Sequence, residues 1–408
     1  MKRQIASASG LSFFLLFLFS SSVFADFKLL DAIQEFGEKR FIKPQPTRLK
    51  AGPLQIHPTL RTSVQYDDNV LLEQEDEKKD VIFNIKPGAI LEIPIDKHQV
   101  ALGYEGEFEI FSKLSRQNDQ NQAFFALGDF HFPDWYVNIL ERLVETSSRS
   151  GSTFTGRIPH IDQSIHPKVG YQWKRLIFEA GFRHFLRDFR RVVDAPFDFQ
   201  LYEGSGVIYY NLFARLKALL EYQAGWIVYD HNPTRRGTIH QGRVGVEGEV
   251  LPNVLLKARV GPQFRNYRTA SEADFNSWVG DLAFEYEVRK NLKLKLTLSR
   301  SPVEATFGEV NFYKEHAAGF GVEYQLRPQW TLFAEPQYAL HHYAERAVLG
   351  NQVGFRRDRL ISSKSGVRYL AREWLEFECA YEFLYRESNM QGLSYNDNRF
   401  SFTTNLTY

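Results

Sequence analysis

The sequence predicts an all-β fold, a transmembrane antiparallel up-and-down β-barrel of about 18 strands (range roughly 16 to 18). Three observations predict it. Apolar and polar residues alternate along most of the chain. Aromatic residues make up 15% of the sequence, yet the mean hydropathy is -0.36, so the apolar side chains are dispersed rather than gathered in runs. Short and long polar connections also alternate, as in barrels with short periplasmic turns and long external loops.

The N-terminus predicts the compartment. Lys2 and Arg3 precede the apolar stretch LSFFLLFLFSSSVFA, which ends in a small-residue cleavage pattern at Ala25. The stretch is short for a membrane-spanning helix of about 20 residues. We therefore expect residues 1–25 to be a cleaved signal peptide rather than a membrane anchor.

Residues 26–53 differ from the rest of the chain. Leu29, Leu30, Ile33 and Phe36 have helical spacing, and the proline-containing stretch IKPQPTRLKAGP is typical of an extended linker. We predict a periplasmic leader helix and a Pro-rich linker. The helix either plugs a pore or binds a partner, or it is a loosely docked leader.

Residues 54–408 are predicted to form the barrel, because the hydrophobic period is two from there onward. Clear examples are VIFNIKPGAILEIPI (81–95), NLKLKLTLS (291–299) and EWLEFECAYEFLY (373–385). Runs of this kind are roughly 10–15 residues long, close to the 9–11 that a tilted strand needs to cross a bilayer. The predicted strands are 56–69, 80–94, 98–112, 122–132, 135–146, 162–174, 176–188, 199–212, 215–229, 237–249, 253–267, 276–288, 291–300, 311–325, 329–341, 357–370, 373–386 and 397–408.

The connections favour a membrane barrel over a soluble β-fold. Short links, such as 94–98, 174–175 and 289–291, alternate with long polar ones, such as 72–80 and 342–357. A soluble sandwich or propeller has no reason to place its long loops at every second connection. A soluble sheet also has no helices to cover its apolar face, and charges on the other face are costly in a dry core.

Charged residues on the polar parity change sign from strand to strand in the C-terminal half. Neighbouring strands lie about 4.8 Å apart, so we expect cross-strand ion pairs around a hydrated lumen. This predicts a polar, charge-lined, porin-like channel for small hydrophilic solutes, with lipid outside. The alternative is a lumen filled by its own side chains, in a non-conducting scaffold barrel of the cell envelope. The predicted lumen-lining residues are Glu105, Glu107, Glu109, Lys257, Arg259, Asp281, Glu285, Lys293, Lys295, Lys364, Arg368, Glu376, Glu378, Glu382 and Arg399.

Other functions have little support in the sequence. It contains no P-loop, dinucleotide fingerprint, zinc spacing or nucleophile elbow, so we expect neither an enzyme nor a cofactor. The near-neutral formal charge of +1 argues against nucleic acid, which needs a basic surface. Asp67, Asp68 and Asn69 form a weak Ca²⁺ candidate beside an acidic run, whereas Asp and Asn at this position are also typical of a turn.

One stretch carries a family resemblance. SVQYDDNVLL, an acidic loop and DVIFNIKPGAILEIPI resemble the opening hairpin of the outer-membrane β-barrel (porin 2-like) family, from Arg61 to about Leu102. The resemblance implies a barrel of similar size in the outer membrane of a Gram-negative bacterium, with no catalytic residues. Members of that family are often encoded with exopolysaccharide systems, which implies a link to polysaccharide export or envelope assembly.

The chain ends on a complete strand, NRFSFTTNLTY. Phe400, Phe402, Leu406 and Tyr408 resemble the terminal signal that the barrel-assembly machinery recognises in such barrels. That signal usually carries a glycine near the end, where this chain has Thr403. We interpret the segment as the closing strand, with these four side chains toward lipid and its free edge paired with the first predicted strand.

Overall fold

The computed structural model describes residues 49–147, 157–268, 273–305 and 310–407. The predicted signal peptide (1–25), the leader helix and Tyr408 lie outside these residues. Within the described ranges, no helix is long and apolar enough to cross a membrane.

The described residues form a sheet of 19 strands with short 3-10 helices in three of the connections. The strands are β1 (Leu49–Ala51), β2 (Leu54–Asp67), β3 (Asp80–Ile95), β4 (His98–Phe111), β5 (Asp119–His131), β6 (Trp135–Thr146), β7 (His160–Trp173), β8 (Leu176–Phe189), β9 (Phe199–Phe213), β10 (Leu216–Tyr229), β11 (Gly237–Leu251), β12 (Val254–Tyr267), β13 (Phe275–Arg289), β14 (Leu292–Glu304), β15 (Phe312–Arg327), β16 (Trp330–Leu349), β17 (Gln352–Arg372), β18 (Leu375–Ser388) and β19 (Tyr395–Thr407). The 3-10 helices are η1 (Ser115–Gln117), η2 (Ala195–Phe197) and η3 (Pro233–Arg235).

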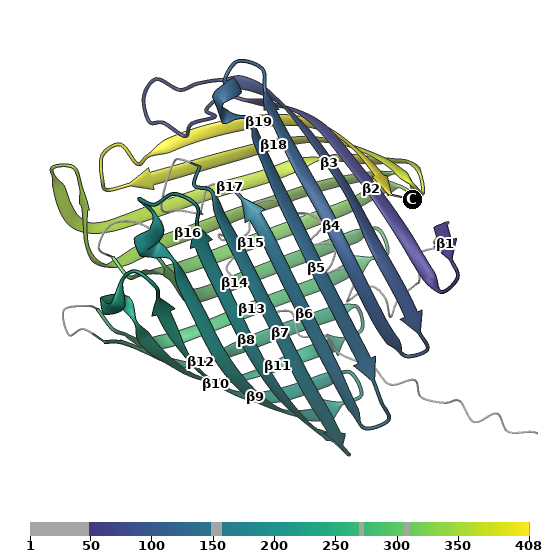
Figure 1. The fold of residues 1–408 in the computed structure, drawn as a ribbon. Coiled ribbons are helices and arrows are strands. Elements are labelled where there is room, and N and C mark those ends of the chain that lie inside the picture. The colour runs from purple at the N-terminus through teal and green to yellow at the C-terminus, as the bar shows by residue number, and fades with distance from the viewer. Residues whose placement is uncertain (1–48, 148–156, 269–272, 306–309, 408) are drawn as a thin grey trace, which may run out of the picture.

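Strands β2 to β19 form a closed antiparallel barrel of 18 strands (Figure 1). Each pairs with its neighbour in sequence, and β19 pairs with β2 from Arg399↔Asp67 to Thr407↔Thr59. The predicted fold class is confirmed, and the last strand closes the barrel against the first as expected. Strand β1, in the last part of the predicted linker, pairs with the start of β2.

The two faces of the wall differ as the period of two requires. Large apolar side chains on one parity are exposed around the barrel, for example Val64, Phe83, Leu102 and Phe402. The opposite parity is mostly buried or polar, for example Asn84 and Lys86 between the exposed residues of β3. The exposed apolar face is therefore the outer one, and the polar face points into the barrel.

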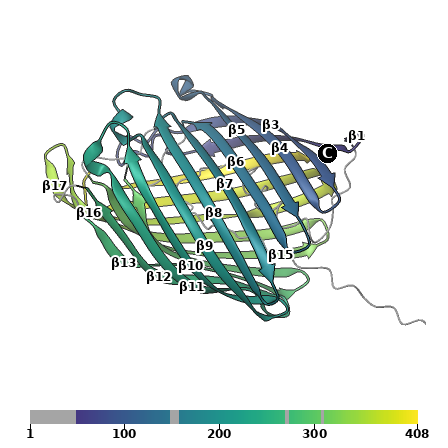
Figure 2. The same cartoon turned by 60° about the horizontal axis from the view of Figure 1, so that its bottom comes forward.

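Apart from the β16–β17 hairpin, short turns gather at one end of the barrel and longer connections at the other (Figure 2). Asp96, Lys174 and Asn253 adopt positive φ in two-residue turns, as tight hairpins require. We call these ends the turn end and the loop end. Both the start of β2 and the end of β19 lie at the turn end.

One predicted loop is a hairpin. Residues 342–357 were expected to be a long polar connection, but β16 and β17 continue through them and meet at a turn at Gly350 and Asn351. Gly350 has φ +56°, which suits a tight hairpin turn. The prediction was wrong because alternation persists there: Val348, Val353 and Phe355 remain on the outer face.

Two inner glycines make room for aromatic rings. Gly103 lies opposite Phe125, and Gly170 lies opposite Tyr136. A Cβ on either glycine would overlap the facing ring, so the rings lie against bare backbone on the inner wall.

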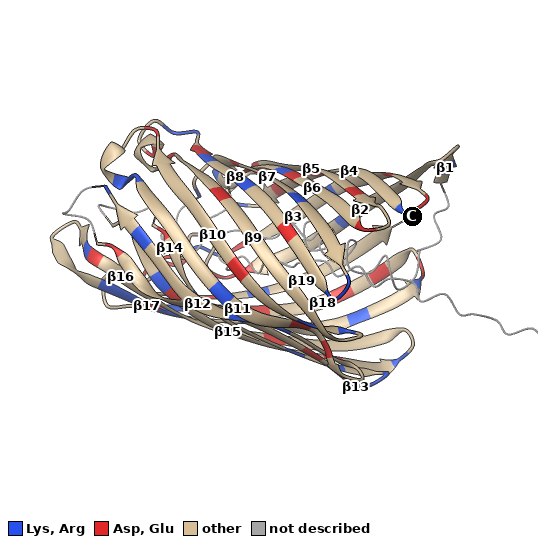
Figure 3. Ribbon diagram, turned by 90° about the horizontal axis from the view of Figure 1, so that it is seen from below, with Lys and Arg blue, Asp and Glu red and all other residues tan. Residues whose placement is uncertain are grey.

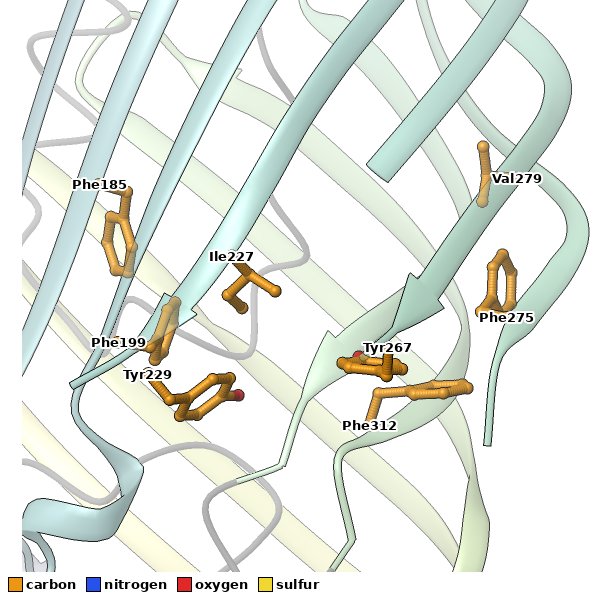
Figure 4. Close-up of a cluster of buried hydrophobic side chains, with 8 residues drawn as sticks. All are labelled: Phe185, Phe199, Ile227, Tyr229, Tyr267, Phe275, Val279 and Phe312. Carbon is orange, nitrogen blue, oxygen red and sulfur yellow. The ribbon is translucent and has the colours of Figure 1, made fainter. Parts of the chain in front are cut away.

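The largest cluster of buried apolar side chains lies inside the barrel toward the loop end (Figure 4). It joins strands from β8 to β15. Its members are Phe185, Phe199, Ile227, Tyr229, Tyr267, Phe275, Val279 and Phe312.

Candidate functional site

Charged residues recur from strand to strand around the barrel (Figure 3), and the candidate site is the inner wall that many of them face. Each of the predicted lumen-lining residues lies on the polar parity of its strand, opposite to the parity that carries most of the exposed apolar side chains. Leu255 and Leu370, near the turn end, are exposed on the inner parity. On β4, Glu105, Glu107 and Glu109 alternate with the outer residues Leu102 and Ile110. The structure thus puts the predicted set on the inner face, where it divides into groups of very different burial.

A buried network joins β10, β11, β12 and β13. Arg243 donates to Glu221 at 2.9 and 3.0 Å and to Asp281 at 3.0 Å. Arg259 donates to Glu247 at 3.0 Å and lies 3.6 Å from Glu221. Glu221 and Glu247 are each only 1% exposed, so each arginine is held between carboxylates away from water. Such a network loses much of its stability when one partner is removed.

A second group links β15, β17 and β18. Arg368 bridges Glu323 at 3.2 Å and Glu378 at 3.0 Å. Lys364 also reaches Glu378, at 2.9 Å, and the guanidinium carbon of Arg368 lies 4.1 Å from the centre of the Phe333 ring. The carboxylate of Glu378 is buried, whereas the Arg368 side chain is 26% exposed.

The third group, on β13 and β14 near the turn end, is solvated. Glu285 lies opposite Lys295, and Glu287 lies opposite Lys293. Lys293 and Glu287 are 3.3 Å apart, and both side chains are 51% exposed. In this exposed ladder, charges of both signs meet water on the inner wall.

The other predicted residues lie in smaller pairs. Lys86 and Glu107 are 2.5 Å apart, and Arg157 pairs with Glu109. Asn405 donates to Glu376 at 3.1 Å. Glu105 is buried beside Glu107, and Lys257 is half-buried at the turn end of β12.

The closing seam is held by charges that also include the Ca²⁺ candidate. Arg399 on β19 lies 2.7 Å from Asp397, 3.2 Å from Asp67 on β2 and 3.8 Å from Glu382 on β18. An ion pair therefore crosses the junction between the first and last barrel strands.

Asp68 and Asn69, which follow Asp67, form hydrogen bonds at the same junction. Asp68 accepts hydrogen bonds from the backbone and side chain of Asn398. The Asn69 amide donates to the carbonyls of Glu73 and Asn396. Their hydrogen bonds anchor the first loop to β19, as expected of Asp and Asn at a turn. Among the described residues, no group of three or more His, Cys, Asp or Glu side chains could hold a metal ion.

Sequence reasoning missed two buried features near the loop end. One is an ionic cluster in which Asp358 lies 2.7 Å from Arg356 and 2.8 Å from Arg386, all with essentially no exposure. Arg356 also packs against the Tyr343 ring, 4.5 Å from its centre. The sequence does contain a signal for this cluster, because Arg356 and Asp358 are two residues apart and so share a face of a strand. The signal was missed because Arg356 lies in the predicted loop and Asp358 lies next to it.

The other is the apolar cluster of Figure 4, whose inner residues interrupt the polar parity. The sequence signal for this cluster is a pair of apolar residues, Ile227 and Tyr229, at positions of β10 that face inward. The Tyr229 hydroxyl donates to Glu304 at 2.8 Å, from β10 to β14, and Arg265 on β12 also contacts Glu304. Side chains from strands far apart in the sheet thus meet inside this end.

Two adjacent histidines on β16, His341 and His342, face opposite sides of the wall. His341 is buried on the inner face and lies 3.0 Å from Glu315, whereas His342 is exposed on the outer face.

The likeness to solved structures is one of fold. The outer membrane protein OpdK from Pseudomonas aeruginosa is 11% identical, with 87% of this chain and 99% of that chain covered and a TM-score of 0.47. OccAB4 from Acinetobacter baumannii is 10% identical over 89% of this chain and 100% of that chain, with a TM-score of 0.49. A BenF-like porin from Pseudomonas fluorescens Pf-5 is 10% identical over 88% and 99%, with a TM-score of 0.47. No curated protein matches the sequence.

A family model described as "Putative beta-barrel porin 2" matches residues 192–408, more than half of the chain. The match covers the C-terminal strands, including the exposed ladder and the closing strand, and it does not include residues 61–102, where the resemblance noted from the sequence lies. Porins are channels rather than enzymes. The chain therefore belongs to this beta-barrel porin 2 family and is a porin-like β-barrel of the Gram-negative outer membrane.

Proposed function

We propose that the barrel is a weakly selective channel for small hydrophilic solutes, with a charge-lined inner wall. The exposed ladder carries this proposal, because Glu285, Glu287, Lys293 and Lys295 are exposed or cross-strand neighbours on the inner face. Charges of both signs at one level favour hydrated solutes without strong preference for either sign. A barrel of about 16 to 18 strands is also wide enough to leave an aqueous channel.

The narrow part of the passage is proposed to lie toward the loop end. The apolar cluster and the Tyr229–Glu304 hydrogen bond join strands on different parts of the wall there. By contrast, the Lys293–Glu287 pair lies at the turn end in water. Solutes would then meet a wide vestibule at the turn end and a constriction at the loop end.

Single-channel recording in planar bilayers tests the proposal. The purified chain, with and without residues 26–53, should give stepwise currents in about 1 M salt, as expected of an aqueous channel. Neutralising the two ladder lysines, Lys293→Gln with Lys295→Gln, should shift the reversal potential in a salt gradient toward cation selectivity. Arg359→Gln on the outer face is the matched control and should leave it unchanged. Folded protein without current, in both forms, would reject the channel.

A second candidate, a non-conducting scaffold barrel of the envelope, is favoured by the same apolar cluster. Phe312→Ala removes a fully buried ring from its centre. If the wild type is silent and this variant conducts, the barrel is a channel that is closed at the loop end. If neither conducts, the scaffold is supported.

We propose further that the channel serves polysaccharide export, which rests on the family resemblance alone. A strain that lacks the protein should then accumulate polysaccharide in the periplasm, and the wild-type chain should restore its release. Normal release without the protein would overturn the export role and leave the solute channel intact.

A further inference from the structure

The outer face of the wall carries a group of basic residues that the channel does not use. They lie on β14 to β17 toward the loop end, and we call them the basic patch. The basic patch consists of Arg300, Lys314, His316, His342, Arg346, Arg357 and Arg359.

These side chains share the outer parity of their strands. Lys314 and His316 alternate with inner residues and precede Phe320, which is 45% exposed. Arg357 and Arg359 lie between Phe355 and Ile361, both exposed. The guanidinium carbon of Arg300 lies 4.1 Å from the centre of the exposed Trp278 ring.

The register sets the patch in rows. Lys314 lies opposite His342, which lies opposite Arg357. One pair nearer the turn end, Arg300 lies opposite His316. Lys314 and Arg357 thus lie on either side of His342, two strands apart, so the row presents positive charge that would attract an anion against the outer face.

Few carboxylates offset this charge. Glu387 pairs with Arg359 at 3.0 Å. Within the described ranges, no ion pair joins Lys314, Arg346 or Arg357 to a carboxylate. A row near the loop end of β7 to β10 carries no such charge: it consists of Gln163, Leu186, Gln200 and Val228, which lie opposite one another in turn.

The height of the patch matches the edge of a membrane. From Trp330, an exposed aromatic at the turn end of β16, to His342 the strand covers roughly 40 Å at about 3.3 Å per residue. A tilt of about 40° reduces this to roughly 30 Å along the barrel axis, slightly more than the apolar band of about 25 Å. Lysine or arginine facing hydrocarbon is costly, but the cost falls close to zero at the interface.

We propose that the basic patch binds the phosphate groups of an anionic glycolipid in the external leaflet, and so orients the barrel with one wall against that lipid. The rows supply several cations within a few strand spacings, and the exposed apolar side chains below them, Phe320, Tyr338 and Ile361, contact the acyl chains. Basic clusters beside lipid-facing surfaces bind anionic head groups in this way.

Native mass spectrometry of the full chain, refolded in detergent, tests the proposal. The probes are bis-phosphorylated lipid A and the same lipid after dephosphorylation. The wild type should retain the phosphorylated form preferentially. Lys314→Gln with Arg357→Gln should lower its affinity at least about tenfold, and Arg300→Gln with Arg359→Gln, from the adjacent row, should also lower it.

Arg190→Gln is the matched control, because Arg190 is an exposed loop-end arginine elsewhere on the barrel, paired with Glu145 at 3.1 Å. Heat-modifiable mobility on gels establishes that each variant is folded. Equal retention of the dephosphorylated lipid, or an effect of the control as large as that of the row variants, would overturn the proposal. Displacement of the lipid by millimolar inorganic phosphate would also overturn it, since the site would then serve a small anion.

Discussion

Two groups of ion pairs on the same inner wall are built in opposite ways. The buried network on β10 to β13 encloses Glu221 and Glu247, each 1% exposed. The exposed ladder, on β13 and β14, leaves Lys293 and Glu287 half in water. Both groups come from the same sequence pattern, in which sign alternates between neighbouring strands. The sequence pattern therefore determines which residues pair, whereas burial determines how much each pair contributes to stability.

The physical reason is desolvation. Charges in water gain little from pairing, because solvent already stabilises each ion. Buried charges have lost that solvent and depend on each other and on their hydrogen bonds. The buried network should therefore hold the wall together, and the exposed ladder should act on solutes.

The largest expected effect comes from Arg259→Met. It leaves Glu221 and Glu247 short of a cation in a buried site, which should cost about 3–5 kcal/mol of unfolding free energy. Urea unfolding of the refolded barrel in lipid vesicles measures it. Arg259→Lys, which keeps a charge, should lose less. A loss below about 1 kcal/mol for the methionine variant would mean that the network is solvated like the ladder.

An intermediate effect is expected from Arg368→Met. The Arg368 side chain is 26% exposed, so water would partly replace its contacts with Glu323 and Glu378. The same unfolding measurement should give a loss of about 1–3 kcal/mol. A loss as large as that of Arg259→Met would show that burial of the carboxylate alone decides the energy.

The smallest effect on stability is expected from Glu287→Gln combined with Lys293→Gln. This removes one exposed pair, and the unfolding free energy should change by less than about 1 kcal/mol. The comparison fails if this double variant unfolds as readily as Arg259→Met.

The salt dependence of the two groups should also differ. Mobile ions screen exposed charges beyond about 3 Å at 1 M ionic strength and buried charges much less. Raising the salt should thus reduce the selectivity contributed by Lys293 and Lys295, while the stability difference between wild type and Arg259→Met should persist. A stability difference that disappears in high salt would contradict the buried state of the network.

Local pattern predicted most of the fold. Alternation determined the strands, their two faces and the closure of β19 on β2, because side chains in a strand alternate strictly between two environments. The predicted parity also put the lumen candidates, from Glu105 to Arg399, on the inner face. The prediction that residues 342–357 form a loop was wrong. The polar residues there belong to β16 and β17, which extend beyond the barrel wall as a hairpin.

The inward-facing residues and the order of neighbouring strands follow from the amino-acid sequence alone, since both depend on a period of two and on short turns. Which inward charges are buried follows only from how the folded strands are arranged in space. Burial depends on what reaches across the interior, as when Tyr229 meets Glu304 from β10 to β14. The folded structure also revealed the basic patch. Lys314, His342 and Arg357 lie in one row because of the register of three strands, not because of their spacing in the chain.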